Sequence, residues 1–211
     1  SNSDSHTVSP SISTTYHLTV TDANGCSGTA QVSITVNELP NLTASASPPE
    51  ICNGQSSTIS ANASGGSGSY TFSWDQGLGS GATHSVSPGS NTTYTVSVSD
   101  GNSCSASSQV TLTVHPNPNA SIQITPNPAC FGDDVTVNAS VNGGTAPYSY
   151  NWNYGLPDQA SHTLTPGTSM LFFLTVSDVY NCSDNPSQLL TVSPQIVISI
   201  EDIVTPTCYG D

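Results

Sequence analysis

The sequence contains no Lys and no Arg, while 14 of its 211 residues are Asp or Glu, which gives a formal net charge of -14. Proteins that bind nucleic acid neutralise phosphates with Lys and Arg, so we expect no nucleic-acid partner. The same lack excludes Walker-type phosphate loops, cationic contacts to anionic membranes and lysine-asparagine isopeptide bonds. Stability must therefore come from apolar burial, backbone hydrogen bonds and covalent links.

Long apolar runs and helical periodicity are also missing. No apolar run approaches the roughly 20 residues that cross a bilayer, so we expect no membrane insertion of this stretch. Short alternating runs bounded by Gly, Pro, Asn and Ser take their place, and this pattern is typical of half-buried strands. The sequence predicts an all-β fold.

An internal repeat runs through the chain. Cys26, Cys104 and Cys182 are evenly spaced, since 104 − 26 and 182 − 104 both equal 78, and Cys52, Cys130 and Cys208 are spaced in the same way. The same shift superposes further residues: His6, His84 and His162; Pro10, Pro88 and Pro166; Tyr16, Tyr94 and Phe172; Asp22, Asp100 and Asp178; Trp74 and Trp152. Such self-similarity indicates a repeat array.

The period sets the domain boundaries that we expect. Residues 1–38 form the second half of one repeat, 39–116 and 117–194 are complete repeats, and 195–211 open the next. We therefore expect the native chain to be longer. Residues 114–119, which include Pro116 and Pro118, predict an extended, semi-rigid connector between the complete repeats.

Each complete repeat has the features of an immunoglobulin-like (Ig-like) sandwich. In the first, Ser57, Ile59, Ala61 and Ala63 lie on one face of a predicted core strand, and a Gly65-Gly66 turn follows. Alternating aromatic residues come next, and we expect them to fill the centre of the sandwich: Tyr70, Phe72 and Trp74, then Tyr148, Tyr150 and Trp152. About seven strands with a central Trp fit two packed sheets, and the predicted core anchors are Trp74, Trp152, Tyr94 and Phe172.

Two short signatures carry a resemblance to a known family. Residues 15–26 end in Asp-Ala-Asn-Gly-Cys, and residues 51–56 contain Cys-Asn-Gly, with similar Cys-x-Gly-Asp openings at Cys130 and Cys208. They resemble the PKD-like and Ig-like repeats in giant surface proteins of gliding bacteria. The resemblance implies spacers, adhesive stalks or fibre shafts, and a bacterial, secreted or cell-surface location. In the last complete repeat Asp178-Val179-Tyr180-Asn181-Cys182 departs from the pattern, which leaves the type of that turn open.

The even number of cysteines, two per repeat, favours disulfides over zinc, since no Cys-x2-Cys pair occurs. In an Ig-like sandwich Cys52 and Cys104 stand at opposite ends of a strand about 30 Å long, whereas disulfide partners need Cα atoms within about 7 Å. We therefore expect a Cys52–Cys182 bond between adjacent repeats and keep Cys52–Cys104 as the alternative. The disulfide candidates are Cys26, Cys52, Cys104, Cys130, Cys182 and Cys208.

Other residue patterns point to structural roles. No acidic or Cys partner recurs beside the repeated His, so we expect it to pack or face solvent and expect no metal site. The repeated Asp enters a hairpin turn, where it should accept hydrogen bonds from local backbone donors. No Ser-His-Asp grouping or Gly-x-Ser-x-Gly elbow is present, so we expect neither catalysis nor a cofactor.

Asn-x-Ser/Thr sequons make a glycan coat a hypothesis, although Asn and Ser are also common in turns. The sequons lie at Asn41, Asn62, Asn91, Asn119, Asn138 and Asn181. The leading hypothesis for function is the structural shaft of an extracellular fibre or surface adhesin, with copies of itself or adjacent repeats as partners and glycans or surface polysaccharide as further candidates. The alternatives are a carbohydrate-binding or adhesive module, which needs exposed aromatic side chains, and a spacer in a secreted enzyme.

Overall fold

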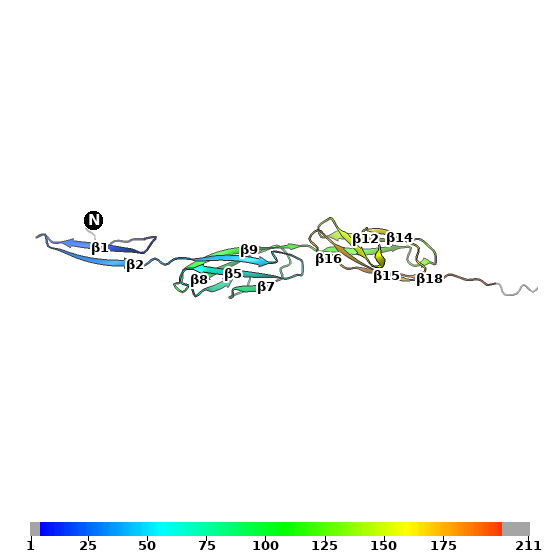
Figure 1. Cartoon of the computed structure of the whole chain (residues 1–211), viewed down its shortest axis with the longest axis horizontal. Coiled ribbons are helices and arrows are strands. Elements are labelled where there is room, and N and C mark those ends of the chain that lie inside the picture. Colours follow the sequence, from blue (N-terminus) through cyan, green and yellow to red (C-terminus); the bar gives the residue numbers. More distant parts are fainter. Residues whose placement is uncertain (1–4, 200–211) are drawn as a thin grey trace, which may run out of the picture. The chain divides into compact units, whose positions relative to one another are not determined.

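A computed structural model describes residues 5–199 (Figure 1). The chain forms two compact units, with the boundary between Val114 and His115. The first unit contains a β-hairpin and a complete β-sandwich, and the second contains another sandwich. Within the described residues, strands make up the regular structure apart from one 3-10 turn, Asn153–Gly155. The all-β class predicted from the sequence is confirmed.

The hairpin consists of β1 (Thr14–Thr21) and β2 (Ser27–Ile34), which pair antiparallel. One face of it is apolar, yet Leu18 and Val20 are each 60% exposed. Their equivalents in the next repeat, Val96 and Val98, are 0% and 1% exposed. The hairpin thus presents the residues that form the core in a complete repeat, and no second sheet covers them within residues 5–199.

The first sandwich has two sheets. One has the order β3-β5-β7, with bounds Pro40–Ser47, Ser57–Gly65 and Thr83–Val86. The other has the order β4-β9-β8-β6, with bounds Glu50–Cys52, Ser105–His115, Thr92–Ser99 and Thr71–Trp74. Ile59 of β5 and Val96 of β8 are fully buried in one apolar cluster with Trp74 and Tyr94. This arrangement is the two-layer Ig-like sandwich that the sequence predicts.

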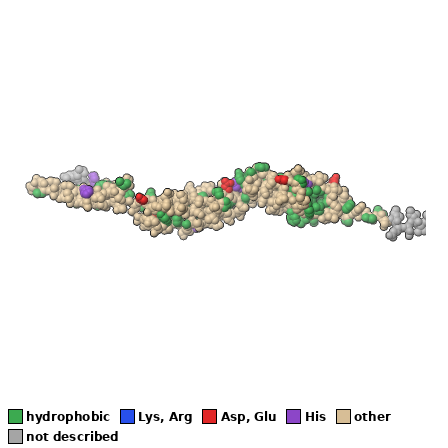
Figure 2. Space-filling view, viewed as in Figure 1, with side chains coloured by type: hydrophobic (Ala, Val, Ile, Leu, Met, Phe, Trp, Pro, Cys, Tyr) green, Lys and Arg blue, Asp and Glu red, His purple; other side chains and the backbone are tan. Residues whose placement is uncertain are grey.

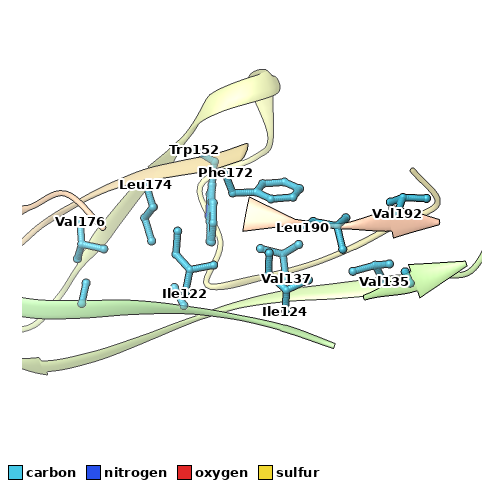
Figure 3. Packing of buried hydrophobic residues seen from close by; sticks show 13 residues of the cluster. Ile122, Ile124, Val135, Val137, Trp152, Phe172, Leu174, Val176, Leu190 and Val192 are labelled. Atoms are coloured by element: carbon cyan, nitrogen blue, oxygen red, sulfur yellow. The ribbon is translucent and has the colours of Figure 1, made fainter. Parts of the chain in front are cut away.

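The second sandwich repeats this plan. Its first sheet has the order β10-β12-β14, with bounds Pro118–Thr125, Val135–Gly143 and Ser161–Leu164. The other contains β13 (Ser149–Trp152), β15 (Met170–Ser177), β16 (Ser183–Asp184) and β17 (Ser187–Leu190), and β11 (Ala129–Cys130) pairs parallel with β18 (Val192–Ser193). Figure 3 shows branched side chains of β10 and β12 pointing at Trp152, Phe172 and Leu174 from the opposite layer. The core therefore lies between the sheets.

The prediction that the three alternating aromatic residues fill the centre of each sandwich holds fully only for the Trp. Trp74 is buried, but Tyr70 and Phe72 are only half-buried, and Tyr70 precedes β6. The Tyr70 hydroxyl donates a hydrogen bond to the Gly65 carbonyl oxygen over 2.6 Å, and Tyr148 bonds Gly143 over 2.7 Å. Because the hydroxyl needs a polar partner, the tyrosine ring stays at the rim.

The predicted connector is shorter than the sequence suggests. β9 continues to His115 and β10 begins at Pro118, so only Pro116 and Asn117 lie outside strands. Pro118 is buried and pairs in register with Gly143. The sheet tolerates a proline here because the first residue of a strand sacrifices no ladder hydrogen bond. The opening of the next repeat after residue 199, including Cys208, lies outside the described residues.

Candidate functional site

The repeated Asp organises the same turn in all three hairpins. The Asp100 Oδ1 atom accepts hydrogen bonds from the backbone N–H groups of Asn102 and Cys104, each over 2.9 Å. Asp22 and Asp178 accept the equivalent pairs, also over 2.9 Å. The local role predicted for this Asp is confirmed, and the turn of the last repeat keeps its geometry despite its different sequence.

The residue before each turn cysteine has a left-handed backbone, which explains the glycine in the Asp-Ala-Asn-Gly-Cys sequence. Gly25, Ser103 and Asn181 occupy this position with φ of 84°, 65° and 61°. A left-handed backbone favours Gly and tolerates Asn, which allows the last repeat to depart from the Asp-Ala-Asn-Gly-Cys sequence without changing the turn.

Asp100 also makes a long-range contact that the sequence does not reveal. Its Oδ2 atom accepts a hydrogen bond from the Ser67 N–H over 2.9 Å, in the loop after β5. The backbone N–H of Ser67 is the main cause that holds the pKa of Asp100 below its ordinary value of 3.8; burial opposes this shift, and Cys104 and Asn102 support it. The carboxylate therefore stays ionised and holds two loops together at one end of the sandwich.

Glycine makes room for this carboxylate. A Cβ atom on Gly66 would lie 2.5 Å from the Asp100 Oδ2 atom, and the φ of Gly66 is +59°. Both the space and the left-handed backbone exclude a side chain at this position. In the second repeat Gly144 has φ +64° and lies against Pro118 instead. The Gly-Gly turns predicted from the sequence are thus close-approach positions.

The cysteines among residues 5–199 are in two chemical states. Cys52 and Cys182 are disulfide-bonded, whereas Cys26, Cys104 and Cys130 are free thiols. Cys52 ends β4 and Cys182 closes the Asp178 turn, and both are buried. Cys26 and Cys130 are exposed and Cys104 is half-buried. The pairing predicted from the sequence joins Cys52 to Cys182, and it stays a prediction.

The repeated His packs against the central Trp. The His84 ring meets Trp74 edge-on with centroids 6.1 Å apart, and His162 meets Trp152 over 5.8 Å. In both histidines the Nε2 atom is buried without a hydrogen-bond partner. Packing, one of the two roles expected from the sequence, is therefore the one observed in the complete repeats. Within residues 5–199 no three His, Cys, Asp or Glu side chains lie close enough together to hold a metal ion.

The sequon asparagines lie on outer strand faces and in turns. Asn41 and Asn119 take equivalent exposed positions on β3 and β10, and Asn62 is exposed on β5. Asn91 precedes β8, and its Oδ1 atom accepts a hydrogen bond from the Val114 N–H over 2.7 Å. The last two are Asn138, half-buried on β12, and Asn181, exposed in the Asp178 turn. Five of the six are therefore exposed to solvent.

A hollow is present on the hairpin. An open groove of about 630 Å³ is lined by apolar side chains of β1 and β2 together with His6 and His17. It coincides with the face whose equivalents are buried in the complete repeat. Among residues 5–199 no helix has the length and apolar character that crossing a membrane requires.

Together, the two-layer sheets, buried Trp and Asp-held turns define a tandem Ig-like β-sandwich protein. Two stretches of it, residues 44–79 and 121–156, match the SprB repeat, a repeat of gliding-motility adhesins. Each match extends from the first strand of a complete sandwich to the loop after its Trp. The resemblance to surface repeats of gliding bacteria is thereby confirmed for these two stretches of the chain.

Solved structures share the fold at low sequence identity. The N-terminal eight Ig domains of Down Syndrome Cell Adhesion Molecule (DSCAM) isoform 1.30.30 align with a TM-score of 0.55 and 15% identity, covering 84% of this chain and 30% of that one. A 1.5-MDa bacterial ice-binding adhesin aligns with a TM-score of 0.41 and 15% identity, covering 86% and 74%. The DSCAM alignment shows an Ig-like fold, and this chain spans less than a third of that neighbour. The comparison with curated proteins gives no match.

Proposed function

We propose that this chain is part of the shaft of an extracellular fibre or cell-surface adhesin, in which each Ig-like repeat is joined by a disulfide to a neighbouring repeat. The SprB matches and the Ig-like fold support a surface location. The polar clusters described above hold turns together, which suits a load-bearing module. The observation that carries the proposal is the division of the cysteines into bonded and free.

A staple inside each repeat would give a different division. Cys52 would then pair with Cys104, and Cys130 with Cys182, which would leave neither Cys104 nor Cys130 free. Both are free thiols, while Cys52 and Cys182 are bonded. A bond between cysteines at the sequence separation of Cys52 and Cys182 fits this division. No other two cysteines of the sequence are equally far apart, so such a rule leaves the remaining cysteines without a partner in this stretch. On this basis Cys52 bonds Cys182 across two repeats.

Such a bond changes the path of a pulling force. Force applied to the two ends of the chain would pass through the disulfide and leave residues 53–181 unstretched. At about 3.5 Å per extended residue, reduction should release about 450 Å of additional contour length. Single-molecule pulling of the chain, with and without reductant, measures this difference.

Two substitutions distinguish a disulfide between repeats from disulfides within each repeat. Cys52→Ser should abolish the redox-dependent length, whereas Cys130→Ser should leave it unchanged. Two staples inside the repeats would each hide about 50 residues, and Cys130→Ser would then remove one of two shorter steps of about 180 Å. An oxidised chain that extends as far as the reduced one contradicts the covalent shaft. Non-reducing peptide mapping gives an independent readout of the Cys52–Cys182 peptide.

A glycan coat on the shaft is the second part of the proposal. Five of the six sequon asparagines are exposed, and Asn91, before β8, and Asn181, in the Asp178 turn, lie outside the strands, where attached glycans have the most room. Intact mass of protein from the native source should exceed the polypeptide mass, and Asn→Gln changes should remove the excess. A bare polypeptide mass contradicts the coat without affecting the disulfide.

Burial of the central aromatic residues argues against the carbohydrate-binding alternative. Trp74 and Trp152 are each 4% exposed and donate their Nε1–H groups to Gly81 and Gln159 carbonyl oxygens over 2.9 Å. They are therefore not available as stacking platforms for sugars.

A further inference from the structure

The outer face of one sheet differs sharply between the two complete repeats. In the first repeat, Thr93 and Thr95 of β8 and Thr111 of β9 line this face, and the hydroxyls of Thr93 and Thr111 hydrogen-bond over 2.8 Å. In the second repeat the equivalent positions hold Leu171, Phe173 and Leu189. Leu171 and Leu189 form a cross-strand pair between β15 and β17. A hydroxyl ladder is thus replaced by an apolar surface.

These side chains are exposed. Leu171, Phe173 and Leu189 are 39%, 53% and 52% exposed, and Tyr154 beside them is 58% exposed. We name Tyr154, Leu171, Phe173 and Leu189 the outer patch. In Figure 2 green side chains gather on the repeat that carries β15. Four such side chains present on the order of 400 Å² of apolar surface, the size at which a patch on a monomer is often functional.

The loop beside the outer patch changes in the same direction. In the first repeat, the Asp75 carboxylate accepts a hydrogen bond from the Thr95 N–H over 3.0 Å. In the second, Asn153 takes this place and accepts from the Phe173 N–H over 3.2 Å. The backbone contact is kept and the negative charge is lost. The next residue changes from Gln76 to Tyr154 with the same left-handed backbone, φ 53° and 60°.

From these differences we propose that the outer patch is a contact surface for the outer patch of a second copy of this chain. Every charged side chain of this sequence is acidic, with 14 of them and no Lys or Arg, so two copies repel each other wherever carboxylates approach. β15 and β17 contain no charged residue, and Asn153 removes the charge that stands at this place in the first repeat. A self-complementary pair of flat apolar faces gives an isologous contact.

A sugar is less suited to this surface than a second copy. A carbohydrate site needs unoccupied hydrogen-bonding groups beside its aromatic rings. Here the Tyr154 hydroxyl and the Asn153 Nδ2 atom both donate to the Leu171 carbonyl oxygen, over 3.2 and 2.8 Å. The Asn153 Oδ1 atom already accepts from Phe173. The polar groups beside the rings are therefore committed to the backbone, and apolar side chains are what the outer patch offers.

The contact is weak when taken singly. Two outer patches would bury about 800 Å² in total, below the roughly 1,200–2,000 Å² of stable interfaces. Contacts repeated along two shafts would act together and raise the overall affinity without any new surface. Lateral pairing would thus add to the proposed shaft, but it does not depend on the shaft and is measurable on the isolated chain.

Sedimentation equilibrium on residues 1–211, with the free thiols alkylated, tests the contact up to about millimolar concentration. We expect the average mass to rise with concentration. A variant with Leu171→Thr, Phe173→Thr and Leu189→Thr carries the residues of the first repeat, which already fold at these positions, and should associate at least tenfold more weakly. The reverse graft Asp75→Asn, Gln76→Tyr, Thr93→Leu, Thr95→Phe and Thr111→Leu should strengthen association at least tenfold.

The hairpin provides the control, because its apolar face is also exposed. A Leu18→Thr/Val20→Thr variant should associate as the parent chain does. A parent chain that stays monomeric, a threonine variant that associates like the parent, or association that disappears only in the hairpin variant would each overturn the proposal. Loss of polysaccharide binding in the threonine variant, with an unchanged mass profile, would also overturn it and assign the outer patch to a sugar.

Discussion

The carboxylate of Asp100 and the backbone N–H of Ser67, 33 residues apart in sequence, are joined by a 2.9 Å hydrogen bond. This bond connects the loop after β5 to the turn after β8. Asp178 makes the equivalent bond to the Thr145 N–H over 3.0 Å in the second repeat. One residue type thus closes the same end of both sandwiches, in a protein that has no Lys or Arg to pair with it.

Replacing Asp100 with Asn should destabilise the first sandwich. An amide has one acceptor oxygen, so it cannot serve both Ser67 and the pair Asn102 and Cys104, and a partly buried N–H is left without an acceptor. We expect a lower urea midpoint, followed by Trp fluorescence. Asp75→Asn removes an equal charge and serves as the control. Because Asn153 accepts the equivalent backbone hydrogen bond in the second repeat, this variant should change the urea midpoint little. Equal losses in both variants would contradict a special role of the Asp100 carboxylate in holding the two loops together.

The Asp100 contribution should depend on pH with a defined sign. Hydrogen bonds from Ser67, opposed by burial and supported by Cys104 and Asn102, hold the pKa of Asp100 below 3.8 in the folded protein. A depressed pKa contributes stability above the unfolded value, and this contribution is lost as pH falls through the folded value. The difference in free energy of unfolding between the parent chain and Asp100→Asn should therefore be largest near pH 7 and shrink below about pH 4.

The comparison with the variant matters because acidification has a second effect. Protonation of the other carboxylates removes repulsion in a chain with net charge -14, and this stabilises both proteins at low pH. Urea titrations at pH 7, 5 and 3 on both proteins separate the two effects. A difference between the proteins that stays constant over this range contradicts the role of the ionised carboxylate.

Gly66 tests the space that the carboxylate needs. Ala at either Gly66 or Gly68 must adopt a positive φ, +59° or +72°, which costs about 1 kcal/mol. Only at Gly66 does the new Cβ meet the Asp100 Oδ2 atom, whereas nothing lies within 4 Å at Gly68. We expect Gly66→Ala to lose about 3 kcal/mol of unfolding free energy and Gly68→Ala about 1 kcal/mol. Equal losses would show that the backbone conformation alone requires glycine at Gly66.

Periodicity in the sequence was sufficient to predict the all-β fold, the Gly-Gly turns and the local role of the turn Asp. Each of these depends on residues close together in sequence, such as Asp100 with Asn102 and Cys104. The Asp100 bond to Ser67 could not be predicted, because it needs the two loops to be placed at one end of the sandwich. The rim position of Tyr70 could not be predicted either, because its hydroxyl bonds a backbone carbonyl oxygen that the composition does not reveal.

The outer patch could be predicted from the sequence only in part. Alignment of the two complete repeats shows Thr93 replaced by Leu171 and Thr95 by Phe173. The letters alone do not tell which face of the sheet these residues occupy. The register, which opposes Leu171 to Leu189 and buries Phe172 and Leu174 on the other face, places them on the outside. A one-residue shift would have put them in the core.

The histidine packed against each Trp gives the last prediction. The His84 Nε2 atom is buried without a hydrogen-bond partner, so the folded state carries the cost of desolvating it. His84→Leu removes this polar atom and keeps an apolar contact with Trp74, so the free energy of unfolding should stay the same or rise by up to about 1 kcal/mol. His84→Gln places an amide in the same space and should lose about 1–3 kcal/mol. Urea denaturation of the two variants at pH 7 compares them directly. If Leu destabilises as much as Gln, the imidazole makes a contact that an apolar side chain cannot replace, and the interpretation of His84 as a packing residue is wrong.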